Sequence, residues 1–530
     1  MAFDRLPPQD EYFLDSDTVT APTHIGGLEI YKLPAGEGRD YIQKLYAHLR
    51  KAPVRAEPFN YMLRTGEPEA EGGKSLLGRL RGAARSRKSR NVRGWVKLDK
   101  INVDEHIYLH ALPRPGGQRE LGELVARLHM NRLDRSRPLW EVHLIEGLED
   151  RGFAIYTKLH HSQFDGKRGV ELSMYIRSTD PARRGMPPMW AVDLAKVARK
   201  ADAKPRARAE PPGRLKTLAT WGSALQKFGT LSTTKSEKGV IAPYSAPSSI
   251  LNGPLTPRRR LGTVSLRIDR MKAIGAAVPG SATVNEVLLA VCGGALRRYL
   301  KEQKALPKAP LIAACPVAQA RKDDKASGNA VGQILVSLGT QVADPKRRLL
   351  AVVASSRANK GLMTELDQDT YTNYTRLSMV PQVLAAKTNF AHKVLNANLV
   401  ISNVPGPRDT QYVNGARLVA MYATSLLLAG QALNITASNF GENLDIGILA
   451  CPDLCPSPQH IAVYMGEELE VLERAMGVAR PTTRIRRKPK SKAKGGAESS
   501  AGSKATHSAE KRPARAVRRR AKAAPRKKQA

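Results

Sequence analysis

Strand-like and helix-like segments alternate through two long stretches of this 530-residue chain, and this alternation constrains the fold more than any other feature. Strands followed by helices are typical of α/β domains, and a chain of this length exceeds a single ordinary core. A polar, charged stretch over 192–253 separates the two parts, and within it 204–213 has the proline, glycine and charge of a linker. The sequence therefore predicts an α/β domain over 1–191, a linker over 192–253 and a second α/β domain over 254–479.

The individual elements are predicted from the spacing of apolar residues. Short apolar runs bounded by turn residues indicate strands, and apolar residues three and four positions apart indicate helices. The predicted strands are 25–34, 140–148, 153–159, 263–268, 311–316, 331–338, 398–402, 432–439 and 444–449. The predicted helices are 39–50, 118–133, 167–178, 284–300, 345–362 and 458–476.

The chain is strongly basic, with a formal net charge of +38. From Arg480 onward, 19 lysines and arginines accompany only two glutamates. Such a segment cannot bury a core, so the sequence predicts a disordered basic tail over 480–530. A second basic segment at 79–93 is predicted either as an amphipathic helix lying on an anionic membrane or lipid inclusion, or as a solvated insertion.

The four cysteines are Cys292, Cys315, Cys451 and Cys455. They are too few for a disulfide framework in a chain of this length, and no histidine cluster accompanies them, so we expect buried free thiols and no metal site. The N-terminus lacks a secretory signal, and the longest apolar region, 418–437, contains polar residues that argue against a membrane span. These features predict a cytoplasmic protein.

The segment 160–166 reads His-His-Ser-Gln-Phe-Asp-Gly, an HHxxxDG pattern directly after the predicted strand 153–159. An imidazole at the end of a strand can take a proton from an alcohol as that alcohol attacks an activated acyl group, because its ordinary pKa lies near ~6.5. The chain lacks the GxSxG motif of serine hydrolases, and it lacks the glycine-rich motifs that bind nucleotides and dinucleotides. The pattern therefore favours acyl transfer.

Several blocks accompany the motif in a fixed order. They are 6–14, 24–27, 106–116, Pro138-Leu139-Trp140, Gly328-Asn329, 402–407 and 430–436. With these blocks the chain resembles the bacterial wax ester synthase/diacylglycerol acyltransferase family from about residue 6 to residue 476. HHxxxDG alone would indicate only the wider superfamily of CoA-dependent acyltransferases and condensation domains. The ordered set points to the lipid branch.

The resemblance implies two chloramphenicol-acetyltransferase-like α/β domains with mixed sheets flanked by helices and an active-site tunnel between them. It implies transfer of a fatty acyl group from acyl-CoA, as co-substrate, to diacylglycerol or a long-chain alcohol. Neither a cofactor nor a metal is expected. The other expected partner is an anionic membrane or lipid-inclusion surface, so the protein should be cytoplasmic and peripherally associated with the inner membrane or with inclusions.

His161, the second histidine of the motif, is the predicted general base. Neighbouring residues of a strand point to opposite faces, so His160 is expected to point into its domain and support the site. Asp165 is expected to orient His161, as a carboxylate does in a serine-hydrolase triad, or, as the resemblance implies, to hold the loop through a salt bridge. Gly166 is predicted to permit a tight turn.

Asn285 is the candidate from the second domain. Its amide could stabilise the oxyanion that forms on the thioester carbonyl, or it could cap the helix that starts there. Glu286 follows it where the family usually has Asp, which puts the geometry of this helix start in question. The predicted catalytic residues are thus His161, Asp165 and His160, and the predicted substrate-binding residues are Asn285 and Gly166.

Two other hypotheses remain at the level of sequence. The first is a non-catalytic protein that binds lipid inclusions or nucleic acid through its basic tail. Binding of nucleic acid would then be electrostatic and salt-dependent, because the tail has no aromatic residues to stack on bases. The second is an acyltransferase that acts on a non-lipid acceptor.

Overall fold

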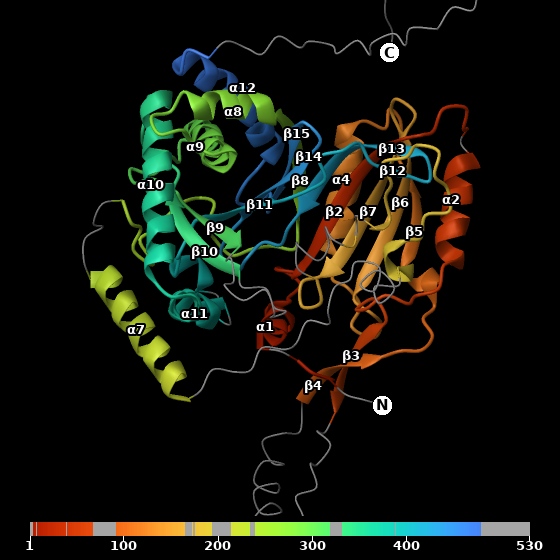
Figure 1. Cartoon of the computed structure of the whole chain (residues 1–530), viewed down its shortest axis with the longest axis horizontal. Coiled ribbons are helices and arrows are strands. Elements are labelled where there is room, and N and C mark those ends of the chain that lie inside the picture. The colour runs from red at the N-terminus through yellow and green to blue at the C-terminus, as the bar shows by residue number, and fades with distance from the viewer. Residues whose placement is uncertain are drawn as a thin grey trace, which may run out of the picture. The chain divides into compact units, whose positions relative to one another are not determined.

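Three β-sheets organise the residues that the computed structural model describes, which are 4–66, 92–164, 172, 175–192, 214–233, 239–318 and 331–478, apart from residues 7, 39, 387 and 389. Two sheets have six strands each and the third has three (Figure 1). The small sheet contains β1 (Asp4–Arg5), β4 (Val92–Lys97) and β3 (Tyr61–Gly66), in that order.

The first large sheet carries the HHxxxDG motif near its centre. Its strands, in spatial order, are β12 (Tyr412–Val413), β13 (Ala416–Thr424), β2 (His24–Lys32), β7 (Gly152–His160), β6 (Trp140–Leu148) and β5 (Ile107–Ala111). Neighbouring strands are antiparallel except β5 and β6, which are parallel. The motif therefore begins on an inner strand that has a neighbour on each side.

The second large sheet is also mixed. Its strands, in spatial order, are β10 (Val331–Ser337), β9 (Ile312–Ala318), β11 (Leu399–Val404), β14 (Leu433–Phe440), β15 (Asn443–Ala450) and β8 (Arg260–Arg267). Here β11 is parallel to both of its neighbours, and the other pairs are antiparallel. The prediction of mixed sheets in an α/β fold is confirmed.

Helices flank both large sheets. The α-helices are α1 (Pro8–Ser16), α2 (Asp40–Lys51), α4 (Gln118–Met130), α7 (Arg214–Thr233), α8 (Ile268–Ala276), α9 (Val284–Glu302), α10 (Pro345–Glu365), α11 (Gln368–Ala386) and α12 (Pro458–Ala475). Short 3₁₀ turns are η1 (Val103–Glu105), η2 (Met189–Ala191) and η3 (Ala391–Lys393). Apolar residues of α8, α9, α10 and α12 share one buried core with the second sheet.

The alternation of side chains along β7 explains how the first sheet is covered on both faces. Phe153 and Leu159 belong to the core that includes Leu45 of α2. Ala154 and Tyr156, at the intervening positions, belong to a second core that includes α4. That second core also includes Leu261 of β8, so α4 lies between the first sheet and the edge of the second.

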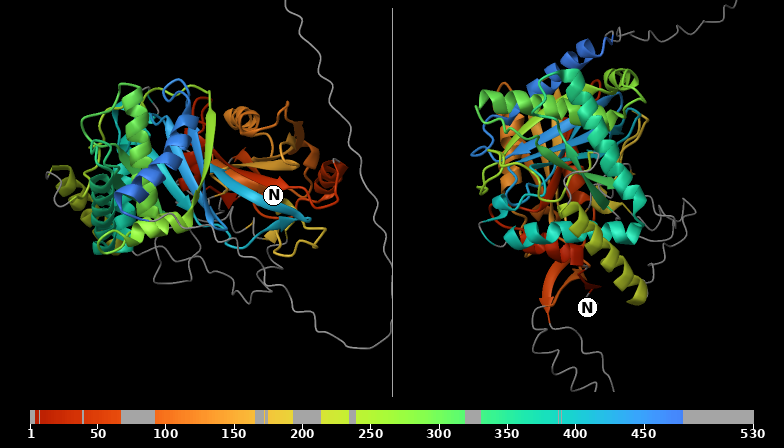
Figure 2. Two further views of the ribbon diagram at one scale, coloured as in Figure 1. Left: turned by 90° about the horizontal axis from the view of Figure 1, so that it is seen from above. Right: turned by 90° about the vertical axis from the view of Figure 1, so that its left-hand side faces the viewer.

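The later half of the chain contributes two strands, β12 and β13, to the first large sheet. Strand β13 comes from the half assigned by sequence to the second domain, yet it pairs with β2 over 26–32 and lies beside it in Figures 1 and 2. It also passes very close to β15, where a Cβ at Gly447 would lie 2.1 Å from the carbonyl oxygen of Ala423. A glycine is therefore required at this crossing. The domain boundaries themselves stay a prediction.

The stretch 192–253 is more than a linker, because Arg214–Thr233 forms the helix α7. Ala224, Phe228 and Leu231 recur at helical spacing and pack with Tyr371 and Tyr374 of α11. The helix also carries apolar residues outside this face, among them Trp221 and Leu225, so its sequence shows no single apolar stripe. The sequence pattern did not predict this helix, and the assignment of 192–253 as the linker between the domains stays a prediction.

Other sequence predictions have mixed outcomes. All four cysteines are buried and free, as predicted. Within the described part of the chain, no helix combines the length and the apolar character that crossing a membrane would need. The tail over 480–530, most of the basic segment 79–93 and most of the predicted helix 167–178 lie outside the described residues.

Candidate active site

The histidine pair is fixed by its backbone at the point where β7 ends. The N–H of His160 donates to the carbonyl oxygen of Leu139 at 3.1 Å, and the N–H of His161 donates to the carbonyl oxygen of Thr23 at 3.1 Å. These bonds run to the segments that enter β6 and β2, the two neighbours of β7. The position of both rings is therefore set by three strands.

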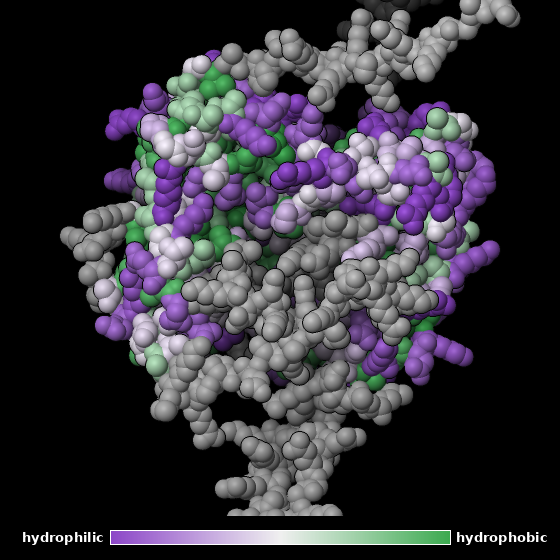
Figure 3. Space-filling model, viewed as in Figure 1, coloured by the Kyte–Doolittle hydropathy of each residue, from purple (hydrophilic) through white to green (hydrophobic). Residues whose placement is uncertain are grey.

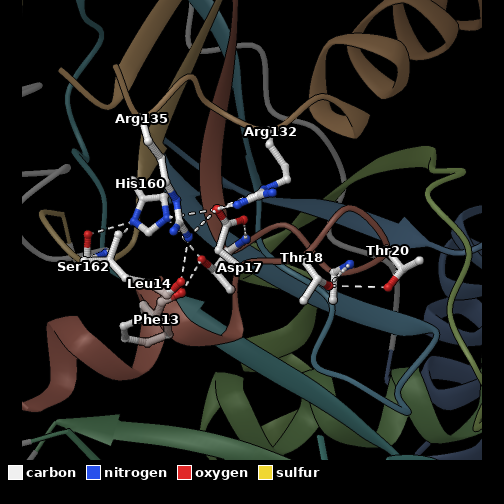
Figure 4. Close-up of polar contacts among 11 residues, drawn as sticks. Phe13, Leu14, Asp17, Thr18, Thr20, Arg132, Arg135, His160 and Ser162 are labelled. Carbon is white, nitrogen blue, oxygen red and sulfur yellow. Dashed lines mark hydrogen bonds and ion pairs between the residues drawn. The ribbon is translucent and has the colours of Figure 1, made fainter. Parts of the chain in front are cut away.

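The side chain of His160 is buried, as strand alternation predicts, and both of its ring nitrogens have polar neighbours (Figure 4). The N–H of Ser162 donates to Nδ1 at 3.2 Å, and the Ser162 hydroxyl lies 2.7 Å from the same nitrogen. Because Nδ1 accepts, the ring proton of the neutral form belongs on Nε2, which lies 3.2 Å from Oγ1 of Thr23. Burial lowers the pKa of His160, so the neutral form is favoured.

Asp17, directly after α1, is the charged centre beside this ring (Figure 4). Its carboxylate accepts from the N–H of Thr23 at 3.2 Å, from Arg132 at 2.9 and 3.1 Å and from Arg135 at 3.1 Å. It lies 3.8 Å from Nε2 of His160. Burial opposes ionisation, but His160 and Arg132 more than offset it and hold the pKa of Asp17 well below its ordinary value.

The ring of His161 is half-buried and stacks on Phe13 of α1, with ring centroids 4.1 Å apart and planes 15° from parallel. Helix α1 is fastened on both sides of this contact. The hydroxyl of Thr23 donates to the carbonyl oxygen of Phe13 at 2.8 Å, and Arg135 donates to the carbonyl oxygen of Leu14 at 2.6 Å. The N-terminal helix thus forms one wall of the position that His161 occupies.

Asn285 is the second residue of α9 and is half-buried. It does not cap the helix, because Thr283 does. The Thr283 hydroxyl accepts from the N–H of Glu286 at 3.2 Å, and the Glu286 carboxylate accepts from the N–H of Thr283 at 2.9 Å. The capping role considered for Asn285 is therefore wrong.

Glu286 also explains how the chain accommodates its departure from the usual Asp. Its carboxylate pairs with Lys360 of α10 at 3.1 Å while it caps Thr283. Burial raises the pKa of Glu286, but the bond from Thr283 and the ammonium of Lys360 bring it below its ordinary value. The longer side chain thus keeps the start of α9 intact and ties it to the neighbouring helix.

Trp140 is a packing residue, as predicted for the Pro-Leu-Trp block. It is fully buried, and its ring stacks on His106 at 4.1 Å and on Trp190 at 5.2 Å between centroids. Its Nε1 donates to the carbonyl oxygen of Phe59 at 2.9 Å. The block therefore anchors the strand next to β7 and contributes no chemical group to the site.

A second buried polar cluster lies on the same face of the first sheet as His160. Nε2 of His24 lies 2.9 Å from the carbonyl oxygen of His129, and Nδ1 of His129 lies 2.6 Å from the hydroxyl of Tyr156. Burial lowers the pKa of His129 to about 3 and that of His24 well below its ordinary value. Both histidines are therefore neutral at physiological pH.

The remaining predicted features are not placed by the structure. Asp165 and Gly166 lie outside the described residues. Two small cavities, one beside β10 and α11 and one beside α2 and β7, include neither His161 nor Asn285 in their linings. The tunnel between the domains therefore stays a prediction.

Comparison with known proteins identifies the family. Residues 79–288 match the wax ester synthase/diacylglycerol acyltransferase catalytic domain, and residues 327–473 match the WS/DGAT C-terminal domain. A protein of Mycobacterium tuberculosis named "Probable diacyglycerol O-acyltransferase tgs2" is 36% identical, covering 90% of this chain and 100% of the relative. The O-acyltransferase WSD of Acinetobacter baylyi is 33% identical, covering 88% of this chain and 96% of the relative.

Comparison with solved structures identifies the same family. A wax ester synthase/diacylglycerol acyltransferase from Marinobacter aquaeolei VT8 is 33% identical, has a TM-score of 0.68 and covers 89% of this chain and 100% of that chain. The first condensation domain of the calcium-dependent antibiotic synthetase shares the fold at 14% identity, with a TM-score of 0.51. The chain belongs to the wax ester synthase/diacylglycerol acyltransferase family, and it is an O-acyltransferase.

Proposed function

We propose that the protein transfers a fatty acyl group from acyl-CoA to the hydroxyl of diacylglycerol or of a long-chain alcohol, with His161 as the general base. The hydroxyl oxygen attacks the thioester carbonyl carbon while the imidazole takes the hydroxyl proton. The tetrahedral intermediate then collapses, the C–S bond breaks, and the proton passes from the imidazolium to the sulfur of CoA. None of these proposed reaction steps uses a cofactor.

The observation that carries the proposal is the position of His161. Its ring follows an inner strand, its backbone is held by Thr23, and its half-buried imidazole is held flat against Phe13. A base held in this way reaches a substrate proton without first having to be ordered, and such a positioned base contributes about 10²–10⁴-fold to the rate.

Four further residues have proposed roles around this base. Because Thr283 and Glu286 cap α9, we assign the amide of Asn285 to the oxyanion of the tetrahedral intermediate. Asp165 is proposed to hold the loop after His161, and Gly166 to allow the turn of that loop. His160 supports the base from the buried side, through Ser162 and Thr23.

The test is His161→Ala, assayed with radiolabelled palmitoyl-CoA and with hexadecanol and diacylglycerol offered side by side. We expect a loss of about 10²–10⁴-fold in kcat with an unchanged circular dichroism spectrum. His460→Ala, an exposed histidine on α12, is the matched control and should keep full activity. Wild-type turnover in His161→Ala would rule out this mechanism, and the ratio of the two products gives the acceptor preference.

The proposed location is the cytoplasmic surface of an anionic membrane or lipid inclusion. The net charge of +38 supports it, because anionic lipid attracts basic protein surfaces. A purely non-catalytic role for the basic tail is not favoured, since the relatives named above are O-acyltransferases. Deletion of 481–530 should therefore leave turnover intact.

A further inference from the structure

Exposed apolar side chains gather on two helices in contact. Among the described residues, five of the nine exposed large hydrophobic side chains lie on α7, on α11 or in the turn after α11. These five form what we call the α7–α11 surface, and they are Trp221 (40% exposed), Leu225 (61%), Val380 (45%), Leu384 (61%) and Phe390 (58%). Figure 3 is seen from the same side as Figure 1, and at lower left, where α7 and α11 lie, hydrophobic and hydrophilic side chains are intermixed among the described residues.

The attachment of α7 explains why these side chains remain exposed. Its inner face packs on α11 through Ala224 and Phe228, and Nδ2 of Asn373 donates to the hydroxyl of Thr220 at 3.1 Å. Trp221 and Leu225, one turn apart, lie outside this contact. Helix α7 therefore buries one face against the protein and leaves a second apolar stripe uncovered, as a helix with a second partner would.

The same stripe repeats on α11. Val380 and Leu384 are again one turn apart, and both are exposed. Phe390 lies four residues after the end of α11, directly before η3, and Nζ of Lys393 lies 5.1 Å from the centre of its ring. Each helix thus presents a pair of large apolar side chains, and a basic group accompanies the aromatic ring.

The two stretches of sequence that carry this surface are basic, and Lys227 of α7 lies 3.8 Å from an acidic residue outside them, Glu365 of α10. The chain has no Asp or Glu between Glu210 and Glu237, and none between Asp369 and Asp409. Of the basic residues in these intervals whose side chains the structure describes, Lys227 lies on α7, and the exposed Arg376 and Lys393 lie on α11 and at the end of η3. Exposed apolar side chains accompanied by basic residues are typical of protein segments that lie in the head-group layer of an anionic membrane.

We propose that the α7–α11 surface docks on an anionic phospholipid surface, with the five apolar side chains entering the acyl layer and the basic residues contacting head groups. The docking rests on the exposed side chains and the charge. Only its purpose, which is to bring the enzyme to its lipid acceptor, rests on the proposed function. None of the five apolar residues belongs to the basic tail, so docking should survive deletion of 481–530.

Trp221 makes the proposal directly measurable. The chain has four tryptophans, and the other three, Trp95, Trp140 and Trp190, are buried. A blue shift of tryptophan emission on addition of phosphatidylglycerol vesicles therefore reports the environment of Trp221. We expect this shift with the full-length protein, and we expect it to weaken with added salt and with phosphatidylcholine vesicles. An unchanged emission spectrum at saturating vesicle concentration would overturn the proposal.

The variant that tests the surface is the double substitution Leu225→Glu with Leu384→Glu. Both side chains are exposed, so the fold should be retained, which circular dichroism checks. We expect vesicle binding to weaken at least tenfold in a flotation assay. Val463→Glu, an exposed apolar residue on α12, is the matched control and should bind as the wild type does. Equal binding by the double variant and the wild type would refute the assignment of this surface.

An activity split separates this proposal from the proposed function. The double variant should keep the wild-type rate with a water-soluble short-chain alcohol and lose rate with diacylglycerol held in phosphatidylglycerol vesicles. Vesicle binding is measured without substrates, so an inactive enzyme would refute the proposed function and leave the binding result valid. Equal rates of double variant and wild type on vesicle-held diacylglycerol would refute the delivery of acceptor through this surface.

Discussion

Replacing Asp17 by Asn tests how the histidine pair is held in place. The Asp17 carboxylate is buried and accepts from three groups: the N–H of Thr23 and the guanidinium groups of Arg132 and Arg135. The substitution removes the negative charge and turns one acceptor oxygen into an NH₂ donor. One of the two arginines, or Thr23, then faces a donor in place of an acceptor.

The expected cost follows from this geometry. Removing one partner of a buried ion pair costs about 3–5 kcal/mol because a charge remains uncompensated. The side chains of Arg132 and Arg135 are 33% and 34% exposed, so water can partly replace the acceptor that they lose. We therefore expect a loss of about 3 kcal/mol, the lower end of this range. Thr23 also binds the N–H of His161, so a displacement there moves the proposed base, and a misplacement of about 1 Å can cost about 10²-fold in rate.

The assay combines unfolding and turnover. Urea unfolding should show the loss of stability, and release of CoA measured with a thiol reagent should show kcat reduced about 10–100-fold with a smaller change in KM. Asp104→Asn is the control, because Asp104 makes a two-bond ion pair with Arg50 at the surface, and loss of such a pair costs less than about 1 kcal/mol. The reasoning is refuted if Asp17→Asn matches Asp104→Asn in both stability and kcat.

Two further predictions concern the pH dependence of stability and the start of α9. The pKa of His129 is about 3 in the folded protein, below the ordinary value near ~6.5, so its contribution to stability is complete above pH ~6.5 and is lost as pH falls toward 3. Protonation of His129 should lower the free energy of unfolding by about 3 kcal/mol between pH ~7.5 and ~4.5. In His129→Gln, the slope of the free energy of unfolding against pH, measured with urea, should fall by the amount that one bound proton contributes. An equally steep slope in the variant contradicts this. Glu286→Asp should lose about 1 kcal/mol, because the shorter side chain cannot both cap Thr283 and pair with Lys360, and an unchanged unfolding midpoint would show that Asp reaches both.

The sequence predicted those parts of the fold in which a local pattern decides the structure. The apolar run 153–159 became β7 (Gly152–His160), and the apolar face from 284 onward became α9 (Val284–Glu302). The pairing of distant strands could not be predicted from the sequence. Strands β13 and β2 are separated by almost the whole chain, and neither strand contains a pattern that specifies the other as its partner. Helix α7 was missed because its apolar residues lie on more than one face, and because Gly222, Gly229 and polar residues interrupt the pattern.

For the site as well, the local features were predicted from the sequence and the long-range contacts were not. The motif placed the two histidines at a strand end, and the structure agrees with that position. Phe13, Asp17 and Arg135 were missed as neighbours, because they reach the pair from α1 and from the loop after α4 and carry no local signal of that contact. Only the order of similar blocks linked the N-terminus to the motif, and it gave no geometry.

The pairing of β13 with β2 has a practical consequence for the design of truncated and chimeric proteins. A fragment that stops before residue 254 would lack β13, and β2 would become the rim of its sheet with unpaired N–H and C=O groups. Exposed edge strands pair with strands of other chains, so the isolated first half should aggregate. A hybrid of two relatives should therefore inherit 412–424 from the same parent as residues 24–32, even though the remainder of the later half comes from the other parent.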